Sequence, residues 1–304
     1  MQSQTIAETI NEVAVKREVF APIYKAFEPL FILRDSLAEE LKALIKQSPF
    51  KLPNWDAQKA NKGNSLLSNV PLTGLEDIFS FTGSKLFETL ISVFSLVDQK
   101  EKIWNMVQDG KLLVGLSEAL LNGDETKLSM LANQCELPIP VLLLSVETIL
   151  GTVISALVSD FGNPWDSHPS AWTQGTCPVC GDFPSIAYLE PKIFDEKNAF
   201  LEGGGGKKHL HCGLCGTEWH FKRGVCPNCG ADDSGTIEIL RQEKDSFGER
   251  IEWCVKCKTY CPSIDLRERQ KMPNMDVQSL AMMYLDFVAK EKGLTPLRPS
   301  VWNQ

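Results

Sequence analysis

The sequence has no excess of positive charge. Its 304 residues include 31 Lys and Arg against 39 Asp and Glu, which gives a formal net charge of −8. Proteins that bind nucleic acids or anionic membranes usually carry a basic face that attracts the polyanion. The segment from Cys177 to Cys261 offers no such face by composition, because its 11 Lys and Arg and 13 Asp and Glu leave a net charge of −2. We therefore expect neither nucleic acid nor a membrane as a partner.

The sequence also lacks the marks of export and of membrane insertion. Residues 1–20 contain no apolar stretch of the kind found in secretory signals. The longest apolar run, Val141 to Val158, is close to the lower limit of about 17 residues for a spanning helix. However, it contains Glu147 and is not flanked by Lys or Arg. We predict a buried helix in a cytoplasmic protein.

Motifs that would mark an enzyme are missing as well. The chain has only four histidines, and neither the H-E-x-x-H motif of zinc proteases nor the H-x-E motif of zinc deaminases occurs. We therefore predict that the protein is not an enzyme, with no catalytic residue and no site for an organic cofactor.

What the chain does have is ten cysteines, nine of which lie between Cys177 and Cys261. The tenth, Cys135, lies in a helical stretch and is predicted to be a small core residue. A secreted disulfide scaffold would be shorter and would rarely pair its cysteines so uniformly. Eight of the nine form four C-x-x-C pairs: Cys177 and Cys180, Cys212 and Cys215, Cys226 and Cys229, and Cys254 and Cys257.

Each pair has the sequence of a metal-binding turn. The residue after the second cysteine often needs a positive φ, which glycine adopts at little cost. Gly181, Gly216 and Gly230 occupy this position in the first three pairs, whereas Lys258 occupies it in the fourth. Two such turns supply four thiolates, which suit Zn²⁺ or a single iron in tetrahedral geometry. The four pairs therefore predict two metal sites that use all eight cysteines.

Two pairings of these turns are possible. A tandem arrangement joins the first pair with the second and the third with the fourth, whereas a nested one joins the two middle pairs. Spacers of 31 and 24 residues leave room for a β-hairpin between tandem partners, so we favour tandem pairing. With four thiolates the ion has no open coordination position, which argues against metal-assisted hydrolysis.

Four further side chains lie near the predicted sites. His209, His211 and His220 flank the second pair and could replace a cysteine as ligand, but we expect them to pack or to form hydrogen bonds. Cys261 is either a spare packed thiol or a reactive thiol near the second site.

The pattern predicts an α+β, multidomain fold. An N-terminal all-α bundle is followed by two tandem rubredoxin-like or zinc-ribbon four-cysteine modules and a C-terminal helix. We expect Ser84 and Asp124 to cap helices of the bundle, and Asp276 to cap the last helix, which ends at Gly293. The predicted parts are a helical domain (1–165), a first metal module (166–221), a second metal module (222–270), and a C-terminal helix with a tail (271–304).

The cysteine segment resembles a known family. Leu210 to His220 reads Leu-His-Cys-Gly-Leu-Cys-Gly-Thr-Glu-Trp-His and is followed by Arg223 and Cys226-Pro-Asn-Cys229. This resembles the signature of the formate dehydrogenase accessory protein FdhE family, and the first and fourth cysteine pairs fit in the same order. The resemblance covers about residues 172–295.

The resemblance implies a helical domain followed by two rubredoxin-like ribbons. It also implies a cytoplasmic protein that binds the catalytic subunit of a molybdenum- or tungsten-dependent formate dehydrogenase during its maturation. Iron in two four-cysteine sites is the implied metal, with zinc possible in purified protein. Two alternatives remain open: a rubredoxin-like protein that passes electrons and, against the charge balance, a zinc-ribbon module that binds nucleic acid.

Overall fold

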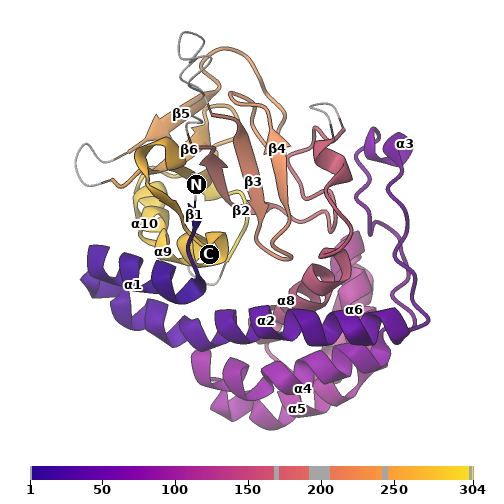
Figure 1. The fold of residues 1–304 in the computed structure, drawn as a ribbon. Helices are drawn as coiled ribbons and strands as arrows, with labels where there is room; N and C mark the ends of the chain where they lie inside the picture. Colours follow the sequence, from indigo (N-terminus) through magenta and orange to yellow (C-terminus); the bar gives the residue numbers. More distant parts are fainter. Residues whose placement is uncertain (1, 168–170, 192–205, 242–245, 301–302, 304) are drawn as a thin grey trace.

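The computed structural model describes residues 2–167, 171–191, 206–241, 246–300 and 303. After a two-residue strand, β1 (Gln2–Ser3), the chain up to residue 158 consists of helices joined by turns and loops, and a mixed sheet with two more helices follows (Figure 1). The predicted α+β, multidomain fold class is confirmed. The helices of the first part are α1 (Ile6–Lys16), α2 (Ala21–Gln47), α3 (Ala57–Ala60), α4 (Glu76–Val93), α5 (Lys100–Gln108), α6 (Gly110–Asn122), α7 (Glu125–Cys135) and α8 (Ile139–Val158).

Of the two caps predicted for the helical bundle, one is confirmed and one is wrong. Asp124 caps α7 as predicted, since its carboxylate accepts a hydrogen bond of 2.9 Å from the Lys127 N–H. Ser84, predicted as a cap, instead lies inside α4 and accepts a hydrogen bond from Gln108 Nε2. The prediction was wrong because the apolar stripe of α4 begins earlier, at Ile78, one and a half turns before Ser84.

The apolar run of the sequence forms α8 in the middle of the helical layer. By length and composition, α8 is the one helix of the described residues that could cross a membrane, and 61% of its most apolar window is buried inside the protein. It packs against α2, α4 and α6. The hydroxyls of Ser145, Thr148 and Thr152 donate to carbonyl oxygens one turn back, at 2.7–2.9 Å. These side chains are therefore satisfied within a buried helix, as the sequence predicted.

The second half of the chain forms one sheet that contains both cysteine modules. Its strands follow the order β4-β3-β2-β7-β6-β5, with β9 paired to β7. Parallel pairing of β2 with β7, which sets Ala187 opposite Ser263, joins the two modules edge to edge. The division into separate metal modules therefore stays a prediction. The strands of this sheet are β2 (Pro184–Leu189), β3 (Lys208–Cys212), β4 (Glu218–Phe221), β5 (Ile237–Leu240), β6 (Glu249–Cys254), β7 (Thr259–Asp265) and β9 (Thr295–Pro296). A separate two-stranded sheet pairs β1 with β8 (Lys271–Met272).

The two modules repeat one arrangement. In each, a C-x-x-C turn is followed by two antiparallel strands, the second strand runs into the next C-x-x-C turn, and a third strand follows. The first strand of module one (β2) lies beside the last strand of module two (β7). This is the tandem duplication that the spacing of the cysteine pairs indicated.

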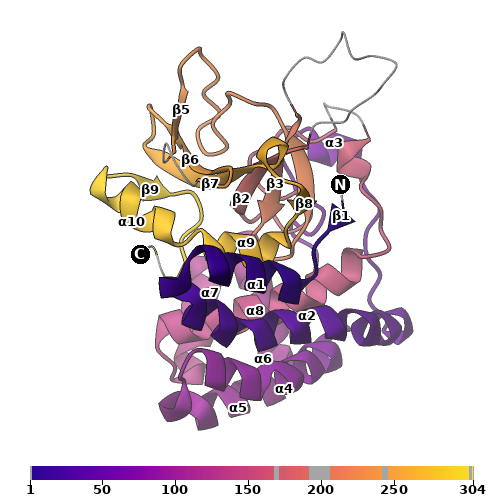
Figure 2. The same ribbon diagram turned by 60° about the vertical axis from the view of Figure 1, so that its left-hand side comes forward.

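Two short helices, α9 (Met275–Ala281) and α10 (Tyr284–Glu291), take the place of the single C-terminal helix that was predicted. Asn274 caps α9 by accepting a hydrogen bond from the Val277 N–H, so the prediction of Asp276 as the cap was wrong. Asp276 is engaged elsewhere, with His211. α9 lies between the sheet and helices α1 and α2 (Figure 2).

A close contact joins the helical layer to the first module at Gly151. A Cβ atom added to this residue of α8 would lie 2.1 Å from the carbonyl oxygen of Leu214, inside the second C-x-x-C turn. That distance is a hard clash with backbone, so only glycine permits the turn to sit against the helix.

We therefore expect Gly151→Ala to lower the free energy of unfolding by about 1–3 kcal/mol, despite the better helix propensity of alanine. Gly115→Ala in α6 is the matched control, because its Cβ would meet only the flexible end of Leu131. The control should be neutral or slightly stabilising. Urea unfolding followed by circular dichroism measures both, and equal stabilities would contradict this view of the contact.

Candidate metal centres

The eight cysteines of the four pairs gather in two groups of four. Cys177, Cys180, Cys212 and Cys215 form the first group, and Cys226, Cys229, Cys254 and Cys257 form the second; within each group the sulfur atoms lie within 4.8 Å of one another. The pairs are thus joined in tandem, first with second and third with fourth. All eight thiols are free of disulfide bonds.

The sulfur spacing fits a tetrahedral metal ion. Sγ–Sγ distances are 3.4–3.7 Å in the first group and 3.6–3.8 Å across the second. Four sulfurs at about 2.3 Å from an ion stand about 3.8 Å apart, whereas a disulfide would bring two of them to about 2.05 Å. The soft, all-thiolate donor set therefore suits zinc or iron at both positions.

All four C-x-x-C turns share one backbone geometry. The N–H after the second cysteine donates to the carbonyl of the first cysteine in each turn, at 2.9–3.2 Å. The donating residues are Gly181, Gly216, Gly230 and Lys258, with φ values of 81°, 73°, 72° and 61°. Lys258 therefore adopts the left-handed conformation that glycine takes in the other three turns, and the fourth turn is formed like the rest.

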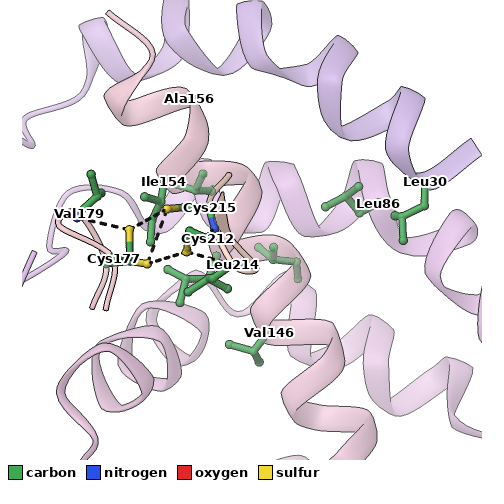
Figure 3. Close-up of a cluster of buried hydrophobic side chains, with 14 of the residues drawn as sticks. Leu30, Leu86, Val146, Ile154, Ala156, Cys177, Val179, Cys212, Leu214 and Cys215 are labelled. Carbon is green, nitrogen blue, oxygen red and sulfur yellow. Dashed lines mark hydrogen bonds between the residues drawn. The ribbon is translucent and has the colours of Figure 1, made fainter. Parts of the chain in front are cut away.

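The first group lies inside the hydrophobic core that it shares with the helical layer (Figure 3). Its four cysteines are between 0% and 3% exposed, and they pack with Val179, Leu214 and residues of α8 such as Ile154. Burial raises the pKa of the Cys177 and Cys180 thiols well above the ordinary value. Four thiolates can therefore coexist here only beside a positive charge, which a divalent ion would supply.

The second group lies at the surface. Cys229 is exposed and Cys257 is half-buried, although Cys226 and Cys254 are buried. Burial opposes ionisation of Cys257, but hydrogen bonds from Thr259 outweigh it and lower the pKa of this thiol to about 6. A thiolate that forms at neutral pH without a metal is ready to bind one.

Two threonines beside the sulfurs were missed in the sequence. Thr217 Oγ1 lies 3.2 Å from Cys215 Sγ, and Thr259 Oγ1 lies 2.9 Å from Cys257 Sγ. Both hydroxyls can donate to a thiolate, and such hydrogen bonds tune the charge on metal-bound sulfur. The sequence does carry a signal, because a threonine lies two residues after the second cysteine in both the second and the fourth pair.

The three histidines near the second pair lie outside both sulfur groups. His209 Nε2 lies 2.8 Å from a carboxylate oxygen of Glu190, and the His209 ring meets that of His220 edge to face. His211 is buried between two carboxylates, 3.2 Å from Glu218 and 2.9 Å from Asp276. They pack and form hydrogen bonds, as predicted.

His211 connects the first module to α9 as a cation. Burial alone would lower the pKa of His211, but the hydrogen bonds to Asp276 and Glu218 raise it to about 10. Because this pKa lies above the unfolded value of about 6.5, the stabilisation is complete below pH 6.5 and is lost as the pH rises through 10.

We expect His211→Gln, compared with the native chain, to cost about 3 kcal/mol at pH 6.5 and much less at pH 10. Denaturant unfolding of both chains at a series of pH values gives the difference, in which the titration of the cysteines, common to both chains, cancels. A cost that did not change with pH would mean that His211 is neutral in the folded protein.

The remaining two cysteines are packed thiols. Cys261 on β7 is 4% exposed, and burial raises its pKa to about 12. Of the two roles predicted for Cys261, the geometry therefore favours the packed thiol over the reactive one. Cys135 is buried at the end of α7, and burial raises its pKa as well.

Two close contacts join the first module to the second near the sulfur groups. Lys208 on β3 reaches across the sheet to Glu252 on β6, 2.6 Å away, and both side chains are at least nine-tenths buried. A Cβ on Gly175 would lie 1.9 Å from the carbonyl oxygen of Pro227, inside the third C-x-x-C turn. Buried contacts therefore join the two modules close to both sulfur groups.

Fold and site together define a class: an α+β protein in which a helical layer carries two tandem four-cysteine modules. Comparison with solved structures finds a similar fold. The FdhE protein from Pseudomonas aeruginosa has a crystal structure that superposes with a TM-score of 0.57 at 17% identity, over 99% of this chain and 97% of that one. At that identity the likeness concerns the fold.

Sequence similarity is confined to part of the chain. The FdhE homolog of Aquifex aeolicus is 32% identical over 122 residues, which cover 40% of this chain and 39% of the relative. The FdhE homolog of Shewanella baltica is 36% identical over 130 residues, 41% of this chain and 38% of the relative. The chain thus matches about two fifths of the length of these curated relatives, and no family model matches it. The resemblance to the FdhE family is confirmed by these relatives together with the shared fold.

Proposed function

We propose that this protein assists the maturation of a formate dehydrogenase by binding its catalytic subunit in the cytoplasm, without turnover of its own. The observation that carries the proposal is the pair of four-cysteine groups in an FdhE-like fold. Four thiolates close the coordination sphere of an ion, so these sites suit a structural or sensing role better than hydrolysis.

In this proposal the cysteines bind metal and the helical layer supports the surface that contacts the client. The eight cysteines would hold two ions, four cysteines to each ion, with iron as the first candidate metal and zinc as the second. A bound ion cross-links two turns of the chain and so fixes the surface of its module. The helical layer, locked to the first module at Gly151, holds that surface in place for a client.

Deleting the gene tests the proposal. Formate oxidation in extracts should disappear, while immunoblots show that the dehydrogenase polypeptide is still made. A plasmid copy should restore activity, and a copy with Cys212→Ser should not, because serine is a poor ligand for a soft ion. Full activity in the deletion strain, with no second copy of the gene, would refute the proposed function.

The exposed second group supports one other candidate, electron transfer. If both groups hold iron, the exposed Cys229 would offer a path for an electron from a partner. The distinguishing measurement is optical: reversible bleaching of an iron–thiolate absorption band by a mild reductant, and reoxidation by a protein partner, would favour the redox function over the maturation function.

A further inference from the structure

A cavity of about 370 Å³ lies where the helical layer, the first module and the C-terminal tail meet. This volume is in the usual range for binding sites, and such sites are common between domains. Its walls come from parts of the chain far apart in sequence, and they include Phe31 and Arg34 of α2, Ile139 and Leu143 of α8, Leu214 of the second C-x-x-C turn, and Arg298 of the tail.

The side of the cavity formed by α2 and α8 is apolar and incompletely covered. Phe31, Leu143 and Leu144 line it and are only half-buried, although each belongs to an otherwise well-packed helix. Ile139, the first residue of α8, is 50% exposed and lines the same cavity. Apolar surface left open in a concave site is what an incoming apolar side chain would cover.

The acidic groups of the cavity already have partners. Glu147 pairs with Arg298 at 2.9 Å, and Asp276 with His211 at 2.9 Å. Asp286 accepts a hydrogen bond of 2.5 Å from the Tyr260 hydroxyl. The carboxylates of the cavity therefore do not call for a cation.

Arg34 is different. Its Nη2 donates one long hydrogen bond, of 3.4 Å, to the Leu214 carbonyl, and its Nε is buried with no hydrogen-bond partner among the described residues. The Nε atom is too buried for a ligand to reach, but the described residues form no ion pair with Arg34, unlike Arg298 in the same cavity. A carboxylate matches the end of the guanidinium group, because its two oxygens can accept from the two Nη groups at once. A phosphate dianion would suffer more from the three acidic side chains around it.

We propose that this cavity binds a segment of the partner polypeptide that places an apolar side chain against α8 and a carboxylate against Arg34. The inference rests on the proposed function, since it takes the partner to be the catalytic subunit of a formate dehydrogenase. It assigns to that partner an apolar segment with an Asp, a Glu or its own C-terminal carboxylate.

The first test concerns the apolar wall, and it uses two variants at one position. Ile139→Glu and Ile139→Lys both remove the same apolar side chain from the cavity wall, at a half-exposed site where neither threatens folding. Binding of the purified catalytic subunit, made without its molybdenum cofactor, is measured by biolayer interferometry. We expect both variants to bind several-fold more weakly than the native chain and to a similar extent, because Ile139 lies twelve residues, about 18 Å, along α8 from Gly151, beside which Arg34 Nη2 lies.

Arg34→Gln should weaken binding about tenfold or more, which corresponds to the loss of a charged hydrogen bond. Arg241→Gln is the control, because Arg241 is an exposed arginine that does not line the cavity, and it should leave the affinity unchanged. Circular dichroism and metal content are measured for every variant, so that a folding defect is recognised as such.

The outcomes separate the two proposals. No binding by the native chain would refute the proposed function itself. Native binding that Arg34→Gln and Ile139→Glu leave within twofold would refute the cavity as the docking site and leave the function standing. Native binding that Ile139→Glu weakens but Arg34→Gln leaves within twofold would overturn the carboxylate assignment. A native dimer, seen by light scattering, that Ile139→Glu dissociates would make a second copy of this chain the occupant and overturn the proposal.

Discussion

Replacing Cys177 and Cys180 together with serine is expected to destroy the first metal site and, with it, the packing of the helical layer on the sheet. These two cysteines are 0% and 3% exposed and belong to the hydrophobic core that contains α8. Structural zinc contributes about 10–16 kcal/mol to the folding of small thiolate sites, which equals or exceeds the whole stability of a typical domain. The variant also buries two hydroxyl groups without an ion to satisfy them.

The matched control is Cys226→Ser with Cys229→Ser. Both double variants should retain one ion per chain, because the pairing is in tandem. Only the first should lose cooperative thermal unfolding of its helices, since the cysteines of the second group lie outside both large hydrophobic clusters of the described residues. Equal loss of helix signal in the two variants would contradict the separate roles of the two groups.

Release of metal to a chelator should show two phases that differ in rate by at least tenfold. The second group is open to solvent at Cys229 and partly at Cys257, whereas the sulfurs of the first group are almost completely covered. A chelator must reach the ion before the last thiolate leaves, and local opening of a packed core is far rarer than motion at a surface turn.

Zinc-loaded protein mixed with a coloured chelator gives the rates. The fast phase should account for half of the zinc and be missing from the Cys226→Ser, Cys229→Ser variant. A single phase in the native protein, or loss of the slow phase in that variant, would contradict the assignment of the fast site.

The metal groups could be predicted from the sequence because their determinants are local. A C-x-x-C turn specifies its own hydrogen bond and its own positive φ, so Gly181 and its counterparts marked all but one of the turns. Lys258 is the exception. It adopts a positive φ because the fourth turn needs the same hydrogen bond as the other three, although a lysine prefers a negative φ. Helix caps such as Asp124 are local in the same way.

Other features depend on contacts that no local pattern records. Asp276 was read as a helix cap, but its carboxylate is held by His211, 65 residues away in the chain. Parallel pairing of β2 with β7 joins the two modules, and the strand sequences alone do not specify a partner. The cavity that Arg34 lines likewise depends on segments far apart in the sequence that meet only in the folded protein.

Elemental analysis combined with X-ray absorption on anaerobically purified protein tests the central claim most directly. The tandem four-cysteine geometry predicts two ions per chain, each with four sulfur neighbours at about 2.3 Å and no nitrogen or oxygen ligand. One ion or none in folded protein, or a mixed sulfur and nitrogen shell, would contradict the two all-cysteine sites.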